Sequence, residues 1–190
     1  MKKKLSVLLL TVLIVCIFSQ EAEEQKTMSF DKFGFKMKAP AGLKVKLQTD
    51  STLSFETFEG FDLYIKYSPF DTTGEKYKDF SSFTETYREK FKETVKDDIY
   101  WDYYYMSYDL IFSVDKYKEI NGKSFLYIVY DGVYYDEMYE DYDYDDCFEV
   151  EEYYVVSKGM LCLFIFNSGS DFFSDKQKEI INQMMSSIVF

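Results

Sequence analysis

The sequence predicts an α+β fold in which helices flank a central antiparallel sheet. Short segments rich in Phe, Tyr, Val and Ile recur along most of the chain, separated by turn residues, and this pattern is typical of antiparallel strands. Two other segments repeat apolar residues every three or four positions, as amphipathic helices do. Strands, a helix, more strands and a final helix are the order of elements in a sheet with helices packed against it.

The first strands are expected before residue 70. They are the segments SFDKFGFKMKAP, LKVKLQ, LSFETFE and FDLYIKYS. Turn residues separate them at Pro40-Ala41-Gly42, at Thr49-Asp50 and at Glu59-Gly60.

A helix is expected next, because the apolar period lengthens to three or four residues. Ser82 and Glu85 predict a capping box at its start. Its apolar face comprises Phe80, Phe83, Tyr87, Phe91 and Val95.

Strand patterns then resume in YYYMSYDLIFSVDKYKEI, KSFLYIVYDGVYY, FEVEEYYVVS and MLCLFIFN. Tight turns are expected at Asn121-Gly122 and Lys158-Gly159. The last segment is apolar at every position but its final Asn, which predicts a central strand covered on both faces. A second helix follows, with Ser174 and Gln177 as its cap. Its apolar stripe consists of Ile180, Ile181, Met184 and Ile188.

The N-terminus reads as a secretory signal over residues 1–19. Three lysines precede an apolar run that is too short to span a bilayer, and Ser19 offers a small residue for cleavage. Cys16 follows Val15, where a lipoprotein signal normally has a small residue, so lipid attachment at Cys16 is the disfavoured alternative. Residues 20–190 then form one domain, since no repeat or linker divides them.

The charge of the chain excludes nucleic acid as a partner. The net charge is −12, and loss of the three leader lysines makes it −15. Binding to a phosphate backbone requires an excess of Lys and Arg. Eleven acidic residues and no basic one lie between Asp131 and Glu152, so one stretch carries most of the negative charge.

The residue types present make an enzyme an unfavoured expectation. The sequence has no histidine, which removes His-activated nucleophiles, imidazole bases and His-containing zinc sites. No phosphate-binding or dinucleotide-binding motif is present. We therefore expect no catalytic residue and no cofactor. Paired carboxylates of a glycoside hydrolase remain a further alternative, because the chain has 34 acidic residues.

The acidic stretch from Asp136 to Glu152 raises the question of a cation site. Asp146 stands where a calcium loop needs Gly, and the flanking segments read as strands rather than helices. We therefore expect mainly a solvated hairpin tip, with a cation site as the alternative. The candidate ligands, in calcium-loop spacing, are Asp141, Asp143, Asp145, Glu149 and Glu152.

Cys147 and Cys162 are expected to be reduced. A tight turn at Lys158-Gly159 places Cys162 opposite Val155, eight residues from Cys147, which is too far for a disulfide. Trp101 and its neighbouring tyrosines are expected to pack in the sheet, with a carbohydrate-stacking surface as the weaker alternative.

The segments FGFKMKAPAGLKV, EINGKSFLYIVYDG and MLCLFIF, followed by a helix ending in MSSIVF, resemble one known superfamily. It groups PsbP, the extrinsic subunit of photosystem II, with a yeast Ran-binding import factor and the envelope lipoprotein DcrB. The resemblance implies a PsbP-like α/β/α sandwich. It also implies a binding or assembly subunit without a shared catalytic residue.

The sequence therefore predicts a non-catalytic binding or envelope-associated module that is periplasmic or secreted. Its partner would be a protein or another envelope component, and we expect no membrane-spanning segment in the mature chain. A calcium-binding module is the second hypothesis, and a secreted carboxylate-dependent hydrolase is the third.

The leader supplies the first prediction. We expect the mature chain to begin at or near Gln20 without a lipid, because Val15 spoils the site before Cys16. The intact mass of the protein from its host measures this. A mature chain that begins at a diacylglyceryl-modified Cys16 contradicts it.

Overall fold

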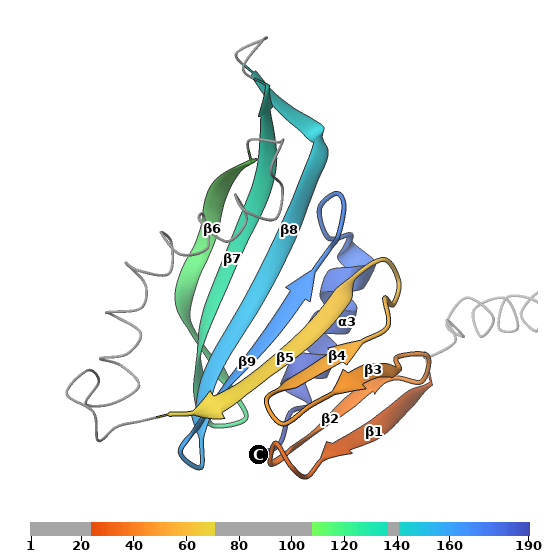
Figure 1. Ribbon diagram of the computed structural model, residues 1–190, viewed down its shortest axis with the longest axis vertical. Helices are drawn as coiled ribbons and strands as arrows, with labels where there is room; N and C mark the ends of the chain where they lie inside the picture. Colours follow the sequence, from red (N-terminus) through yellow and green to blue (C-terminus); the bar gives the residue numbers. More distant parts are fainter. Residues whose placement is uncertain (1–23, 71–107, 137–140) are drawn as a thin grey trace, which may run out of the picture.

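The computed structural model describes residues 24–70, 108–136 and 141–190 (Figure 1). The leader at residues 1–19, the helix expected between Phe80 and Val95, and Trp101 lie outside these residues.

An antiparallel sheet of seven strands forms the body of the molecule, in the order β3-β4-β5-β9-β8-β7-β6 (Figure 1). A hairpin of two further strands forms a separate small sheet. One helix, α3 (Asp175–Ser186), completes the elements of the described residues. The strands are β1 (Gln25–Phe30), β2 (Phe35–Pro40), β3 (Val45–Gln48), β4 (Thr52–Phe55), β5 (Asp62–Pro69), β6 (Tyr108–Ile120), β7 (Lys123–Asp136), β8 (Asp141–Ser157) and β9 (Met160–Asn167).

Strand β9 is the middle strand of the sheet, as its apolar sequence predicts. It lies between β5 and β8 and pairs with both along its whole length. Cys162, Phe164 and Phe166 point to the face that carries the main core and are fully buried, whereas the alternate side chains are half-buried. The two faces of β9 are thus covered unequally.

Two-residue turns set the register of the two long hairpins. Asn121 and Gly122, like Lys158 and Gly159, have φ between 50° and 75°, the left-handed values of the hairpin turn that matches strand twist. The second turn pairs Val155 with Cys162, as the sequence predicts. Both Cys162 and Cys147 are buried, and no disulfide joins them.

Helix α3 covers one face of the sheet. Ser174 and Gln177 form the predicted capping box, in which the Ser174 side chain accepts from the backbone of Gln177 and the Gln177 side chain accepts from the backbone of Ser174. The predicted stripe is confirmed, since the side chains of Ile180, Ile181, Met184 and Ile188 are all buried in the main core.

The hairpin of β1 and β2 was not predicted from the sequence, which reads as one strand from Ser29 to Pro40. A turn interrupts it, and Gly34 has a φ of 69°, which permits the reversal. The hairpin packs against the C-terminal end of the chain, where Lys36 and Val189 exchange backbone hydrogen bonds of 2.8 and 2.9 Å.

The expectation of a sheet flanked by helices needs correction. The described chain is mostly antiparallel sheet, with helix α3 on one face (Figure 1). The opposite face carries a second buried cluster, composed of Leu126, Ile128, Tyr130, Val150 and Tyr154. The fold is therefore mainly β in the described residues.

The packing of α3 supplies the second prediction. Replacing Ile181 by Ala should lower the free energy of unfolding by about 2 to 5 kcal/mol, because its side chain is fully buried in the main core. Chemical denaturation measures the loss. The matched change Glu179→Ala, on the exposed side of the same helix, should stay within about 0.5 kcal/mol of the parent. Equal effects of the two substitutions would mean that the helix face is assigned wrongly.

Candidate functional site

The acidic stretch lies largely in paired strands rather than in a loop. Asp136 ends β7 and pairs with Asp141, the first residue of β8, and Tyr134 pairs with Asp143. The pairing then jumps from Asp143 to Cys147, so residues 144–146 lie opposite no residue of β7. Asp145 falls in this bulge.

The expectation of a solvated hairpin tip is wrong for the second half of the stretch. Glu149, Glu151 and Glu152 are only 6%, 5% and 5% exposed. A buried carboxylate is costly unless hydrogen bonds or an opposite charge compensate it. Each of the three glutamates has such partners, and these partners determine its structural role.

Glu149 joins β8 to helix α3. Its Oε2 atom lies 3.1 Å from Lys178 Nζ and accepts a hydrogen bond of 3.0 Å from the backbone N–H of Phe173, next to the helix cap. Its own backbone N–H donates to Ser168 Oγ at 2.8 Å. Asp131 is its cross-strand neighbour. Burial and the charge of Glu149 raise the pKa of Asp131, and Lys178 opposes this rise.

Glu151 lies on the same face as Glu149 and belongs to a cluster with two tyrosines and a lysine. The Tyr153 hydroxyl donates to Glu151 Oε2 at 2.7 Å, and Tyr127 adds a second hydrogen bond. The two rings pack against each other with centroids 4.6 Å apart and an angle of 33° between their planes. Lys118 Nζ lies 4.9 and 5.4 Å from the Tyr127 and Tyr153 centroids, within the range of cation–π attraction. We call these four residues the lysine–tyrosine–glutamate cluster.

Burial governs the proton equilibria of this cluster. It raises the pKa of Glu151, while hydrogen bonds from Tyr153 and Tyr127 and the charge of Lys118 oppose the rise. Burial and the neighbouring carboxylate raise the pKa of both tyrosine hydroxyls. The tyrosines therefore stay protonated and act as hydrogen-bond donors.

Glu152 points to the opposite face of the sheet. The hydroxyls of Tyr130, at 3.1 Å, and of Tyr154 donate to its carboxylate. Burial raises its pKa, and the two hydrogen bonds oppose the rise. Glu149 and Glu152 therefore point to opposite faces of β8, and the calcium-loop spacing does not bring them together.

A groove opens between α3 and the end of β6, with a volume of about 720 Å³. We call it the α3–β6 groove. Two apolar side chains, Ile120 and Met185, are buried within it, and polar side chains form its rim. Its lining residues are Lys118, Glu119, Ile120, Asn121, Asp175, Lys178, Glu179, Asn182, Gln183, Met185 and Ser186.

Side-chain hydrogen bonds fix the two walls of the groove. Lys118 Nζ donates to Asn182 Oδ1 at 3.2 Å, and Asn121 Nδ2 donates to the carbonyls of Ser186 and Ile188, each at 2.8 Å. Lys118 also belongs to the lysine–tyrosine–glutamate cluster, and Lys178 holds Glu149. Lys178 thus contacts a buried carboxylate directly, and Lys118 lies over the tyrosine rings of the cluster that contains Glu151.

This groove was not predicted from the sequence. The glutamates read as part of an acidic run, although the alternation of Glu149, Glu151 and Tyr153 places them on one face of a strand. The pairing of Tyr127 with Tyr153 completes the cluster, but neither hairpin turn sets this pairing, because those turns join β6 to β7 and β8 to β9. Nothing local in the sequence indicates the position of α3 beside β6.

Other chemistry is limited in the described residues. They contain no group of three Cys, Asp or Glu placed to hold a metal ion. Burial raises the pKa of Cys162 to about 12, so its thiol is a poor nucleophile. Helix α3, the one helix of the described ranges, is neither long nor apolar enough to cross a membrane.

The raised pKa of Glu152 supplies the third prediction. A carboxyl group with a higher pKa in the folded state stabilises the fold below its ordinary pKa of 4.5 and loses that contribution as the pH rises through the folded value. Replacing Glu152 by Gln removes this titration. Denaturation between pH 4.5 and 8 should show the variant gaining stability relative to the parent as the pH rises. The exposed change Glu179→Gln is the control, and a pH-independent difference for Glu152→Gln contradicts the assignment.

Comparison with known proteins supports the fold alone. No family model matches the sequence, and no curated protein matches it significantly. The solution structure of cyanobacterial PsbP (CyanoP) from Synechocystis sp. PCC 6803 is similar, with a TM-score of 0.59 at 14% sequence identity over 90% of this chain and 95% of that one. The Saccharomyces cerevisiae Ran-binding protein Mog1p aligns with a TM-score of 0.48 at 7% identity, over 88% of this chain and 96% of that one. The predicted resemblance is confirmed at the level of structure: this chain has a PsbP-like fold.

Proposed function

We propose that the protein is an exported, non-catalytic binding module that holds a protein or other envelope component in the α3–β6 groove. The observation that carries this proposal is the groove itself, whose polar rim and apolar floor are built on a sheet and a helix that pack together in the main core. Binding sites of this kind combine apolar surface with a few placed polar groups.

The partners of the buried carboxylates support a non-catalytic role. Glu149, Glu151 and Glu152 accept hydrogen bonds or ion pairs from neighbouring groups of the same chain, and none of them lines the groove. Asp131 and Glu149 form a cross-strand carboxylate pair, but neither lines the groove. The hydrolase hypothesis therefore gains no support from these residues.

The calcium hypothesis is also not favoured. Glu149 and Glu152 point to opposite faces of β8 and accept hydrogen bonds from other groups of the chain. A calcium site would therefore depend on Asp141, Asp143 and Asp145 alone. The export proposal rests on the leader at residues 1–19.

Site-specific photocross-linking tests the groove, and this is the fourth prediction. A photoreactive amino acid is placed at Glu179, on the rim, and in a second strain at Lys46, on the exposed strand β3 far along the sheet. Both proteins are expressed in the host from the full sequence. We expect a discrete adduct from position 179 and none from position 46, because only the first position faces the partner.

A second substitution makes this test specific. Asn182→Trp fills the groove from its helical wall and should abolish the adduct at position 179. The melting temperature of each variant confirms that it folds. An adduct that persists with Asn182→Trp, or that forms equally at position 46, contradicts the proposal. Turnover of an envelope polysaccharide by the purified protein would contradict its non-catalytic part.

A further inference from the structure

We infer that the partner in the α3–β6 groove is an extended acidic peptide segment that adds to β6 as an extra strand; this inference rests on the proposed function. Proteins often bind peptides by strand addition at an open sheet edge, where main-chain hydrogen bonds give affinity and alternate side chains give specificity. Four observations on the described residues support it: the edge position of β6, its backbone, its side chains and the helix beside it.

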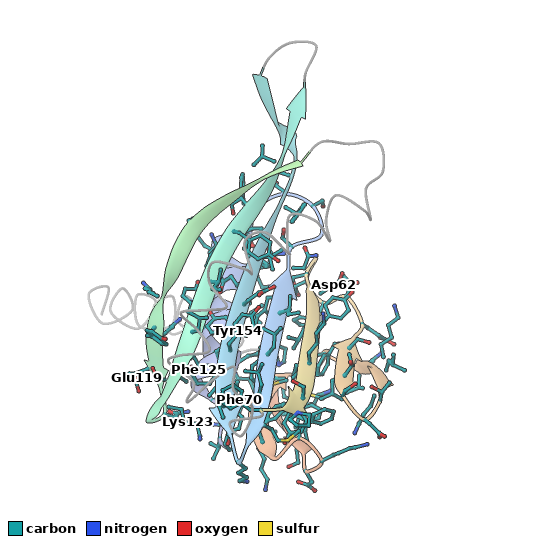
Figure 2. All side chains as sticks on the ribbon, turned by 60° about the vertical axis from the view of Figure 1, so that its left-hand side comes forward. Asp62, Phe70, Glu119, Lys123, Phe125 and Tyr154 are labelled. Atoms are coloured by element: carbon teal, nitrogen blue, oxygen red, sulfur yellow. The ribbon has the colours of Figure 1, made fainter. Side chains whose placement is uncertain are left out.

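Strand β6 ends the sheet. It pairs with β7 on one side, and no described strand lies on its other side. The groove is lined by the last three residues of this edge strand, by Asn121 of the turn that follows, and by one side of α3. Figure 2 shows Glu119 at the outer side of this strand, close to the turn that leads to Lys123. The groove is therefore a channel between a strand edge and a helix.

The backbone at this edge is oriented to receive a strand. Ile120 and Lys123 flank the two-residue turn, so they form the hydrogen-bonded pair that closes the hairpin. Hydrogen-bonded and non-hydrogen-bonded pairs alternate along an antiparallel ladder. Glu119 pairs with Ser124 in the next position, so its N–H and C=O point away from β7 and towards the open edge.

The side chains at the edge set the chemistry of the partner. Lys116 and Lys118 lie two residues apart on β6, so both side chains point to the same face of the sheet. This face carries α3, and on it Lys118 contacts Tyr127 and Tyr153. On the other face, the Tyr117 side chain is 42% exposed. Opposite charges on adjacent strands stabilise their pairing. The added strand would thus carry acidic residues towards α3 and apolar or aromatic residues towards Tyr117.

The helical wall accommodates such a strand in its C-terminal half. Asn182 lies beside Lys118, and Ser186 beside Asn121, so neutral polar side chains face this part of the edge. The acidic side chains of the wall, Asp175 and Glu179, belong to the first half of α3. We therefore place one acidic residue of the partner opposite Lys118 in the groove, and another opposite Lys116, two residues earlier on the same face and outside the groove.

A second copy of the chain is the weaker occupant. Two β6 strands that pair antiparallel around Lys116, Tyr117 or Lys118 bring a lysine opposite a lysine. Like charges in such positions oppose pairing, and lysines on an edge strand are a common protection against self-association.

A synthetic peptide tests the inference, and this is the fifth prediction. The probe is an eight-residue peptide that alternates glutamate with valine or tyrosine, and its controls replace glutamate by lysine or scramble the order. It is titrated into the isotope-labelled protein expressed from the full sequence. We expect binding of the alternating acidic peptide alone, with shifts on β6 and α3 and slowed hydrogen exchange of the Glu119 amide.

Two N-methylated peptides test the strand geometry. One carries N-methyl groups on the glutamates and the other on the interleaved residues, so each loses the N–H groups of one edge only. Exactly one edge faces β6 in an added strand, so one of the two peptides should lose binding and the other should retain it. Equal behaviour of the two overturns strand addition.

Two variants complete the test. Lys116→Glu, on an exposed side chain, should weaken the acidic peptide roughly tenfold and improve the lysine peptide. Glu119→Pro removes the outward N–H, which an edge strand tolerates, and should abolish binding without unfolding the protein. No binding of the acidic peptide, equal binding of the lysine peptide, or a concentration-dependent dimer through β6 overturns the inference. If cross-linking at position 179 succeeds while the peptide fails, only this inference is lost.

Discussion

The structure depends on the compensation of three carboxylates that β8 carries into the interior. A buried glutamate without partners would destabilise a domain by several kcal/mol, a large part of the stability of a typical domain. Glu149 is compensated by Lys178 and the Phe173 N–H, and this contact fixes the start of α3 over the sheet. Glu151 is compensated by tyrosine hydroxyls, whose rings in turn support Lys118. The position of α3 and the shape of the groove beside it follow from these contacts.

The same arrangement separates the two acidic halves of β8. Glu149, Glu151 and Glu152 belong to the framework, because each is buried and held by groups of the chain itself. Asp141 and Asp143 pair with the last residues of β7, in a part of β8 that does not pair with β9. Part of one acidic run thus belongs to the framework of the sheet, and the burial of Glu149, Glu151 and Glu152, rather than their charge, identifies this role.

Much of the sheet was predictable, since its determinants are local. Turns such as Asn121-Gly122 and Lys158-Gly159, the cap at Ser174 and the apolar sequence of β9 each fix their element within a few residues. The hairpin of β1 and β2 was not predicted, because the residues around Gly34 read as part of one strand rather than as a turn. The candidate site was missed for a different reason. It depends on the pairing of Tyr127 with Tyr153 and on the contact of Lys178 with Glu149, which join distant parts of the chain.

The central place of β9 has a consequence for how the protein reaches its folded state. Strand β5, and through it β3 and β4, joins the sheet only by pairing with β9, which lies near the C-terminal end of the chain. Contacts between distant segments form slowly, since the intervening chain must first be ordered. During synthesis, β5 therefore keeps an unpaired edge until β9 has been made. The seven-stranded sheet is therefore completed only after nearly the whole chain has been made.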